Sequence, residues 1–223
     1  ITVDLNRYIK PVLCQEVLSY FASHKEEMAV LFGGLAKATR LSELQKFAAN
    51  FPDDVEGLMR LCGIEYRAPC DATATGLPDD SVDYHTSYTV LEHIPEAVLG
   101  GILDEGERLL RAGGLFVHRV DYSDHFSHSD GSISAINFLQ FSEKQWEKLA
   151  GNRYMYMNRL RHDDFLRLYR AWGHDLLMVG PDVYPELEAV LSDPEFLLDP
   201  RFQQKSQEVL CTTGSWFVTH KNR

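Results

Sequence analysis

The densest group of titratable side chains in the sequence is the loop Asp121–Asp130, directly after a predicted strand. Loops at the carboxyl ends of strands carry the functional groups of many α/β proteins. This loop could supply a catalytic base, bind a divalent metal through imidazole and carboxylate ligands, or be simply solvated. Asp124 and His125 are its best catalytic candidates. We expect no metal site from the set Asp121, Asp124, His125 and His128.

A second group of candidates is basic. Asn158, Arg159 and Arg161 precede a predicted helix. A guanidinium group suits a carboxylate or phosphate on an acceptor molecule, whereas the alternative is a surface charge or an internal salt bridge to Asp163 or Asp164. His93, near the start of another predicted helix, is either a catalytic base or a helix-capping residue.

The elements that must position these residues alternate between strands and helices. Apolar and β-branched runs predict strands over residues 1–6, 64–67, 81–88, 114–121, 175–179 and 214–220. Helical spacing of apolar residues dominates residues 11–62, and further helices are predicted over 95–111, 142–149 and 162–172. The pattern predicts a Rossmann-like, doubly wound α/β fold with a mostly parallel sheet and an antiparallel C-terminal edge strand.

Composition narrows the class of protein. The 223 residues carry a formal net charge of −11, which would repel a phosphate backbone, so nucleic-acid binding is not expected. No apolar run is long enough to span a membrane. The four cysteines show no CxxC spacing, which favours reduced thiols in a cytoplasmic protein. We expect one domain over residues 1–223, with a helical insertion at about 11–62 and an acceptor-side insertion at about 122–161.

Several spaced motifs resemble class I S-adenosylmethionine-dependent methyltransferases of the small-molecule type. They are Asp71-Ala72, Leu77-Pro78-Asp79-Asp80-Ser81-Val82-Asp83, Val90-Leu91-Glu92-His93-Ile94-Pro95 and Leu109-Leu110-Arg111-Ala112-Gly113-Gly114. Because these motifs occur in the family's order, the signal is stronger than any one of them alone. The stretches His118–Asp121, Asp124–Phe126 and Asn158–Arg161 extend the resemblance toward a bacterial subgroup, which we associate with surface-glycan or lipid-linked sugar pathways.

The resemblance implies S-adenosylmethionine as the cofactor. A carboxylate at Asp4 would accept hydrogen bonds from the ribose hydroxyls, with Leu5 and Asn6 beside the adenosine. Asp71 would receive the adenine amino group and Ala72 would supply a backbone donor. The backbone at Ser87 and Tyr88 would hold the methionine end of the cofactor. The alternative is that Asp4, Asp71 and Ser87–Tyr88 simply form the turns that end their strands.

The sequence departs from the family in one respect. It contains no glycine-rich loop of the kind that lets backbone N–H groups approach the cofactor. The strand ending at Asp4 resembles the family's second strand, so we expect the first strand and its loop to lie upstream of Ile1. We therefore expect the chain as given to bind cofactor poorly and to be inactive by itself.

The function implied is transfer of a methyl group from S-adenosylmethionine to a small-molecule or glycan-type acceptor, at oxygen. His93, Asp124 and His125 are the catalytic candidates. The acceptor-binding candidates are His118, Asn158, Arg159 and Arg161. Two alternatives remain open: a non-catalytic fragment or adaptor with this fold, and a metal-dependent hydrolase that uses the Asp121–His128 loop.

Overall fold

A computed structural model describes residues 1–35, 37–51, 54–152 and 155–221 of the chain. The chain divides into two compact units, Ile1–Thr75 and Gly76–Arg223. The single domain predicted over residues 1–223 therefore stays a prediction. None of the helices in the described ranges has the length and apolar character needed to cross a membrane.

The first unit combines a short parallel strand pair with helices. β1 (Thr2–Val3) pairs with β2 (Tyr66–Arg67). The helices between the two strands are α1 (Pro11–Ser23), α2 (Lys25–Phe32), η1 (Gly33–Leu35), α3 (Ala38–Ala49) and α4 (Val55–Cys62). The Asp54 carboxylate caps α4 by accepting from the Gly57 N–H, and Gly63 ends that helix at a φ of 69°, which a residue with a side chain rarely adopts. Helices thus fill most of the predicted insertion at 11–62.

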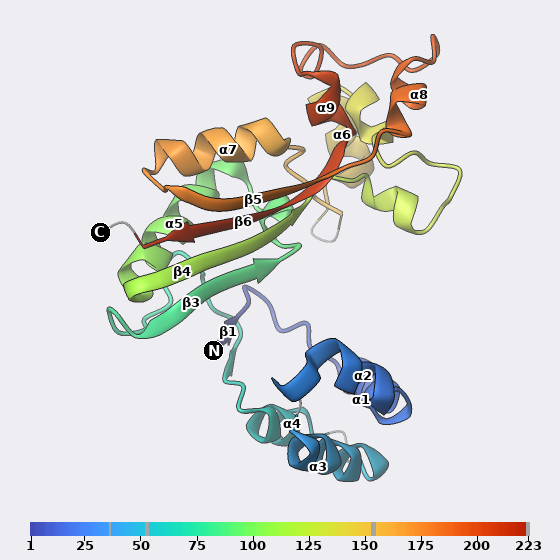
Figure 1. The fold of residues 1–223 in the computed structure, drawn as a ribbon. Coiled ribbons are helices and arrows are strands. Elements are labelled where there is room, and N and C mark those ends of the chain that lie inside the picture. The colour runs from blue at the N-terminus through green and yellow to red at the C-terminus, as the bar shows by residue number, and fades with distance from the viewer. Residues whose placement is uncertain (36, 52–53, 153–154, 222–223) are drawn as a thin grey trace. The chain divides into compact units, whose positions relative to one another are not determined.

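The second unit is built on a four-stranded sheet in the order β3-β4-β6-β5 (Figure 1). The strands are β3 (Val82–Tyr88), β4 (Leu110–Asp121), β5 (Leu176–Val183) and β6 (Thr212–His220). β3 and β4 are parallel and are joined by helix α5 (Glu96–Leu109). β6 runs antiparallel to both β4 and β5.

The predicted α/β class is confirmed, with one change at the edge of the sheet. The described strand pairs β1–β2 and β3–β4 are parallel, and the two pairs made by β6 are antiparallel. The last strand of the chain, β6, lies inside the sheet because it bonds to neighbours on both sides, so β5 forms the edge. The antiparallel strand at the C-terminus was correctly predicted, but its place at the edge was not.

One hydrophobic cluster fixes the helices of the second unit on the sheet. α5 contributes Leu99 and Leu103, and α7 (His162–Ala171) contributes Phe165 and Tyr169. These side chains pack with Phe116 on β4 and with others that alternate along the strands. Two helices that share one apolar cluster hold β3, β4 and β6 in register, because slipping by one residue would turn the buried face outward.

A separate cluster organises the insertion after β4. It includes Phe138, Trp146 and Phe202, all essentially buried. The segment contains η3 (His125–His128), η4 (Asn137–Gln140) and α6 (Glu143–Ala150), and it packs with α8 (Leu187–Leu191) and α9 (Gln207–Cys211). Ser142 and Gln145 form a capping box that starts α6. The loop carrying the titratable residues is thus anchored on a core of its own.

A chain of hydrogen-bonded rings runs through the interior of the second unit. His85 Nδ1 lies 3.0 Å from His118 Nε2, and His118 Nδ1 lies 2.5 Å from the Tyr169 hydroxyl. Burial is the main reason that the pKa of His85 falls to about 4 and that the pKa of His118 falls well below its usual value. Both imidazoles are therefore neutral at pH 7. The rings of His85, His118 and Tyr169 form a neutral hydrogen-bonded network in the core.

We predict that this network makes the protein less stable in mild acid. The unfolded His85 imidazole titrates near 6.5, while the folded one titrates at about 4. Between these values the unfolded chain binds more protons, so the stability is complete above pH 6.5 and is lost as the pH falls toward 4. The free energy of unfolding should decrease by about 2 kcal/mol between pH 7 and pH 5 on account of His85 alone.

Urea unfolding of the wild type and of His85→Gln at both pH values measures this contribution. The amide of glutamine can still bond to His118 but does not titrate in this range. The variant should therefore lose less stability on acidification than the wild type. Equal pH dependence in the two proteins would contradict the prediction.

Candidate active site

The ends of β3 and β4 bring together side chains from two loops. Because the two strands are parallel neighbours, both carboxyl ends lie at the same edge of the sheet. β3 leads into η2 (Leu91–His93), and β4 ends at Asp121 just before η3. Thr89, at a φ of 50°, makes the sharp turn out of β3, and its N–H donates to the Arg119 carbonyl. Two loops far apart in sequence therefore share one edge.

His93 presents one nitrogen to this edge with its lone pair available. Its Nδ1 lies 2.7 Å from the Tyr156 carbonyl oxygen. A carbonyl only accepts, so Nδ1 carries the proton and Nε2 is the unprotonated nitrogen. Burial lowers the pKa of His93 and thereby keeps the imidazole neutral. A neutral imidazole with a fixed tautomer can accept a proton or bind a cation through Nε2.

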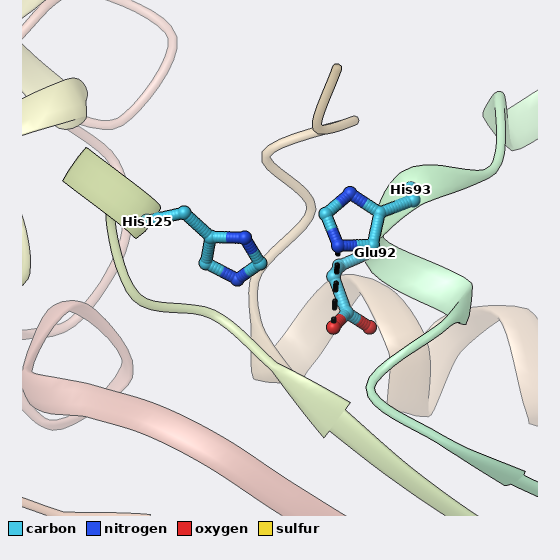
Figure 2. Close-up of side chains that lie close together, drawn as sticks. All are labelled: Glu92, His93 and His125. Carbon is cyan, nitrogen blue, oxygen red and sulfur yellow. Dashed lines mark ion pairs between the residues drawn. The ribbon is translucent and has the colours of Figure 1, made fainter. Parts of the chain in front are cut away.

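Glu92 lies beside His93 and is almost completely buried, with 1% of its surface exposed. Within the described ranges, neither carboxylate oxygen has a hydrogen-bond partner, and Oε1 lies 4.0 Å from His93 Nε2 (Figure 2). Burial raises the pKa of Glu92 to about 7. In the sequence, Glu92 stands out only as part of the Leu91–Glu92–His93 motif, so its burial is not predicted.

His125 faces His93 from the other loop. The two imidazole rings lie 4.9 Å apart at their centroids and point toward one another in Figure 2. His125 Nε2 is 3.6 Å from Asp121 Oδ2, and His128 Nε2 is 3.8 Å from the same oxygen. Burial opposes protonation of His125, but the Asp121 carboxylate outweighs it, so the pKa of His125 is raised. His93 and His125, both predicted as catalytic, are thus brought together.

Asp121 is held ionised at the centre of the second loop. Burial raises its pKa, but His125 and the bonds from Ser123 outweigh burial and bring the pKa to about 2. Asp121 Oδ1 accepts from the Ser123 N–H at 2.7 Å and from its hydroxyl at 2.6 Å. Ser123 Oγ in turn lies 2.9 Å from His128 Nε2. Asp121 is therefore the carboxylate that orients His125.

Asp124, the third predicted catalytic residue, has a different place. It is fully buried, and its Oδ1 accepts from the Phe126 N–H at 3.0 Å, which caps η3. Its Oδ2 lies 3.4 Å from the Asn137 amide nitrogen. The carboxylate therefore shapes the loop that presents His125, and the carboxylate ion-paired with His125 is that of Asp121.

The four residues predicted to bind the acceptor are all buried, with exposed fractions between 0% and 8%. They are His118, Asn158, Arg159 and Arg161. His118, on β4, belongs to the hydrogen-bonded network with His85 and Tyr169. The Asn158 amide donates to the carbonyls of Leu91 and Ile94, both at 2.9 Å, and so holds the turn that carries Glu92 and His93. Both side chains are buried and bonded within the protein, so their contact with an acceptor stays a prediction.

The two arginines also serve the protein's own structure. Arg159 pairs with Glu143 at 2.7 Å and donates to the Phe138 and Phe141 carbonyls. Arg161 donates to the carbonyls of Tyr122, Leu210 and Thr212 at 2.5–3.0 Å. Each guanidinium is buried and already bonded to backbone oxygens, so contact with an acceptor stays a prediction for both. Sequence spacing cannot reveal such burial.

The residues predicted to bind the cofactor lie at strand ends. Asp4 and Asp71 follow the adjacent parallel strands β1 and β2, so they share one edge of the first unit. Asp4 Oδ1 accepts from the Asn6 N–H at 3.1 Å, and Asp71 Oδ1 accepts from the Thr73 N–H and hydroxyl, both at 2.8 Å. The Thr73 N–H and hydroxyl lower the pKa of Asp71.

The other cofactor candidates are Leu5, Asn6 and Ala72 in the first unit and Ser87 and Tyr88 in the second. Leu5 is 67% exposed, Asn6 is exposed and Ala72 is half-buried. Ser87 and Tyr88 end β3 in the second unit, and the Tyr88 side chain is 67% exposed. Their contact with a cofactor stays a prediction.

Comparison with known proteins finds a match to one family model. Residues 43–118 match the model of the methyltransferase domain family. No curated protein matches the chain. Three similar solved structures follow. A SAM-dependent methyltransferase from Methanosarcina mazei shares 11% identity at a TM-score of 0.40, with 70% of this chain and 66% of that chain covered. A putative methyltransferase from Bacillus halodurans shares 16% identity at a TM-score of 0.42, with 73% of this chain and 79% of that chain covered.

The third structure is a geranyl diphosphate methyltransferase in complex with GPP and sinefungin. It shares 12% identity at a TM-score of 0.44, with 82% of this chain and 59% of that chain covered. This chain thus spans less than two thirds of the length of the first and the third of these proteins. The match to the methyltransferase domain family covers residues 43–118.

We predict that Arg161 contributes to stability through its backbone contacts. Arg161→Met removes the donors to three buried carbonyls, so the free energy of unfolding should fall by about 3 kcal/mol in urea denaturation. Arg167 is the matched control, because its side chain is 66% exposed and pairs with Asp164 within the same helix. Arg167→Met should cost less than about 1 kcal/mol. Equal losses in the two variants would show that the buried contacts of Arg161 are not stabilising.

Proposed function

We propose that this chain, which belongs through residues 43–118 to the methyltransferase domain family, transfers a methyl group from S-adenosylmethionine to a hydroxyl oxygen of a small-molecule or glycan-type acceptor. The sulfonium of the cofactor supplies the leaving group, so the protein mainly aligns the acceptor oxygen with the methyl carbon and the sulfur. The O–CH₃ bond forms as the S–CH₃ bond breaks, and the hydroxyl proton must leave.

The observation that carries the proposal is the unprotonated Nε2 of His93 at the carboxyl edge of β3 and β4. Nδ1 is committed to the Tyr156 carbonyl, so Nε2 is the nitrogen that can take the acceptor's proton. His125 faces the same space and is held by Asp121. Asn158 fixes the turn beneath His93. We therefore assign His93 as the base and His125 as the second side chain at the acceptor oxygen.

For the cofactor we retain the residues implied by the resemblance. Asp4 and Asp71 follow neighbouring parallel strands, which suits a ribose contact at Asp4 and an adenine contact at Asp71. Leu5, Asn6 and Ala72 flank them in the sequence. The backbone at Ser87 and Tyr88, where β3 ends, is proposed for the methionine end.

We predict that His93→Gln slows methyl transfer without weakening cofactor binding. Glutamine can still donate to the Tyr156 carbonyl but cannot take a proton, so kcat should fall by roughly 10²–10⁴-fold. The assay follows S-adenosylhomocysteine formation with a panel of hydroxylated small molecules and glycans, on the protein with whatever sequence is encoded upstream of Ile1. His220→Gln is the control, because His220 is exposed at the far end of β6. An unchanged kcat in His93→Gln would refute the assignment of the base.

We predict separately that Asp4→Ala weakens cofactor binding. Loss of a charge-assisted pair of hydrogen bonds to the ribose should raise the dissociation constant of S-adenosylmethionine by the equivalent of about 1–3 kcal/mol. Calorimetric titration of the same protein measures the change. Asp54→Ala, which removes the cap of α4 and the ion pair with Arg60, is the control for loss of a carboxylate in the same unit. If Asp4→Ala binds the cofactor as tightly as the wild type, Asp4 is not the ribose ligand.

A further inference from the structure

The cluster of Glu92, His93 and His125 has a feature that methyl transfer by an imidazole base leaves unexplained. Glu92 is buried beside two imidazoles, and neither of its oxygens has a hydrogen-bond partner in the part of the chain that the structure describes. A buried carboxylate without partners is costly, and it is neutralised either by taking up a proton or by binding a cation. Such a side chain, directed toward two other potential ligands, is the signature of an ion site.

The three side chains offer a suitable set of ligand atoms. One carboxylate oxygen of Glu92 and one ring nitrogen each of His93 and His125 all lie within 4.8 Å of one another. Metal–ligand distances of about 2.0–2.2 Å place neighbouring ligand atoms roughly 3–3.5 Å apart, so each must move inward by about an ångström. Figure 2 shows the two imidazole rings directed toward each other, with the Glu92 carboxylate beside the His93 ring.

The surroundings of His93 match those of a metal ligand. Imidazoles that bind metals usually donate their other N–H to a carbonyl or carboxylate, which fixes the ring and the tautomer. His93 Nδ1 has this partner in the Tyr156 carbonyl at 2.7 Å, so Nε2 faces Glu92 as an unprotonated ligand atom. The backbone around Glu92 is fixed too, because the Asn158 N–H donates to the Glu92 carbonyl at 2.8 Å.

From this geometry we propose that Glu92, His93 and His125 bind one divalent transition-metal cation. Two imidazoles and one carboxylate suit Zn²⁺ or Mn²⁺ and leave positions open for a further ligand. Asp121, 3.6 Å from His125 Nε2, adds negative charge behind that ligand. The set differs from Asp121, Asp124, His125 and His128, for which we expect no metal site, and it shares only His125 with that set. Glu92, which is not a member of that set, is the residue that leads us to propose a metal site here.

The site deepens the proposed function and depends on it only for the location of the acceptor oxygen. The Nε2 lone pair of His93 cannot bind a cation and accept a proton at the same time. With the cation bound, His93 would serve as a ligand in place of its role as the base. The cation would lower the pKa of the acceptor hydroxyl that it binds, and the released proton would pass to solvent water. Metal binding itself is measured without any methyl transfer, so its failure and the failure of the proposed function are distinguishable.

The test is a titration of chelator-treated protein with ZnCl₂ and, in parallel, MnCl₂ at pH 7.5, followed by calorimetry and by the melting temperature. We expect one ion per chain and a rise in Tm on binding. Glu92→Gln, which preserves the shape of the side chain, should weaken binding at least tenfold, and His93→Gln and His125→Gln should abolish it. His220→Gln should retain binding within about threefold, since His220 is exposed at the far end of β6 and lies outside the proposed ligand set.

Three results would overturn the proposal. One is the absence of saturable binding of either ion to the wild type. Another is binding that survives in Glu92→Gln and His93→Gln. The third is binding that is lost in Asp121→Asn or His128→Gln but kept in Glu92→Gln, which would assign the ion to the neighbouring group of Asp121, His125 and His128. Circular dichroism of each variant before titration separates loss of ligands from loss of fold.

Discussion

The parallel pairing of β3 with β4 is the constraint on which the candidate site depends. Parallel neighbours end at the same edge of a sheet, so the loops that follow them meet there although about thirty residues separate them in the chain. One loop carries Glu92 and His93, and the other carries Asp121 and His125. The crossover helix α5 and the cluster around Phe116 keep the pair in register, and the register in turn sets the separation of the two imidazoles.

Sequence patterns predicted what depends on local chemistry and spacing. The ends of β3 and β4, the Leu91–Glu92–His93 motif and the loop around His125 could all be found because strands, turns and family motifs leave short-range signals. Glu92 was not selected because nothing in its neighbours along the chain reveals that its carboxylate is buried without hydrogen bonds. The place of β6 between β4 and β5 was missed for a similar reason, since strand order is a matter of tertiary pairing.

Burial is the property of the candidate residues that the sequence could not predict. Arg159 and Arg161 have the spacing of an anion-binding pair, yet each lies inside the protein and donates to backbone carbonyls of segments far away in sequence. Such guanidinium groups satisfy loop carbonyls that no regular element can pair. Asn158 does the same for the turn that carries His93, because its amide donates to the Leu91 carbonyl. Asp124 holds the turn that carries His125 by accepting from the Phe126 N–H. The polar residues nearest the cluster in sequence therefore support it rather than line it.

The central claim is that His93 is a neutral imidazole with its proton on Nδ1 and its lone pair on Nε2, facing Glu92 and His125. Nitrogen-15 NMR of the metal-free protein, with histidine labelled on the ring nitrogens, measures this directly, and His93→Gln identifies the resonance. At pH 7.5 the account predicts one protonated and one unprotonated nitrogen, with the proton on Nδ1. A resonance pattern with the proton on Nε2, or with both nitrogens protonated, would contradict the account.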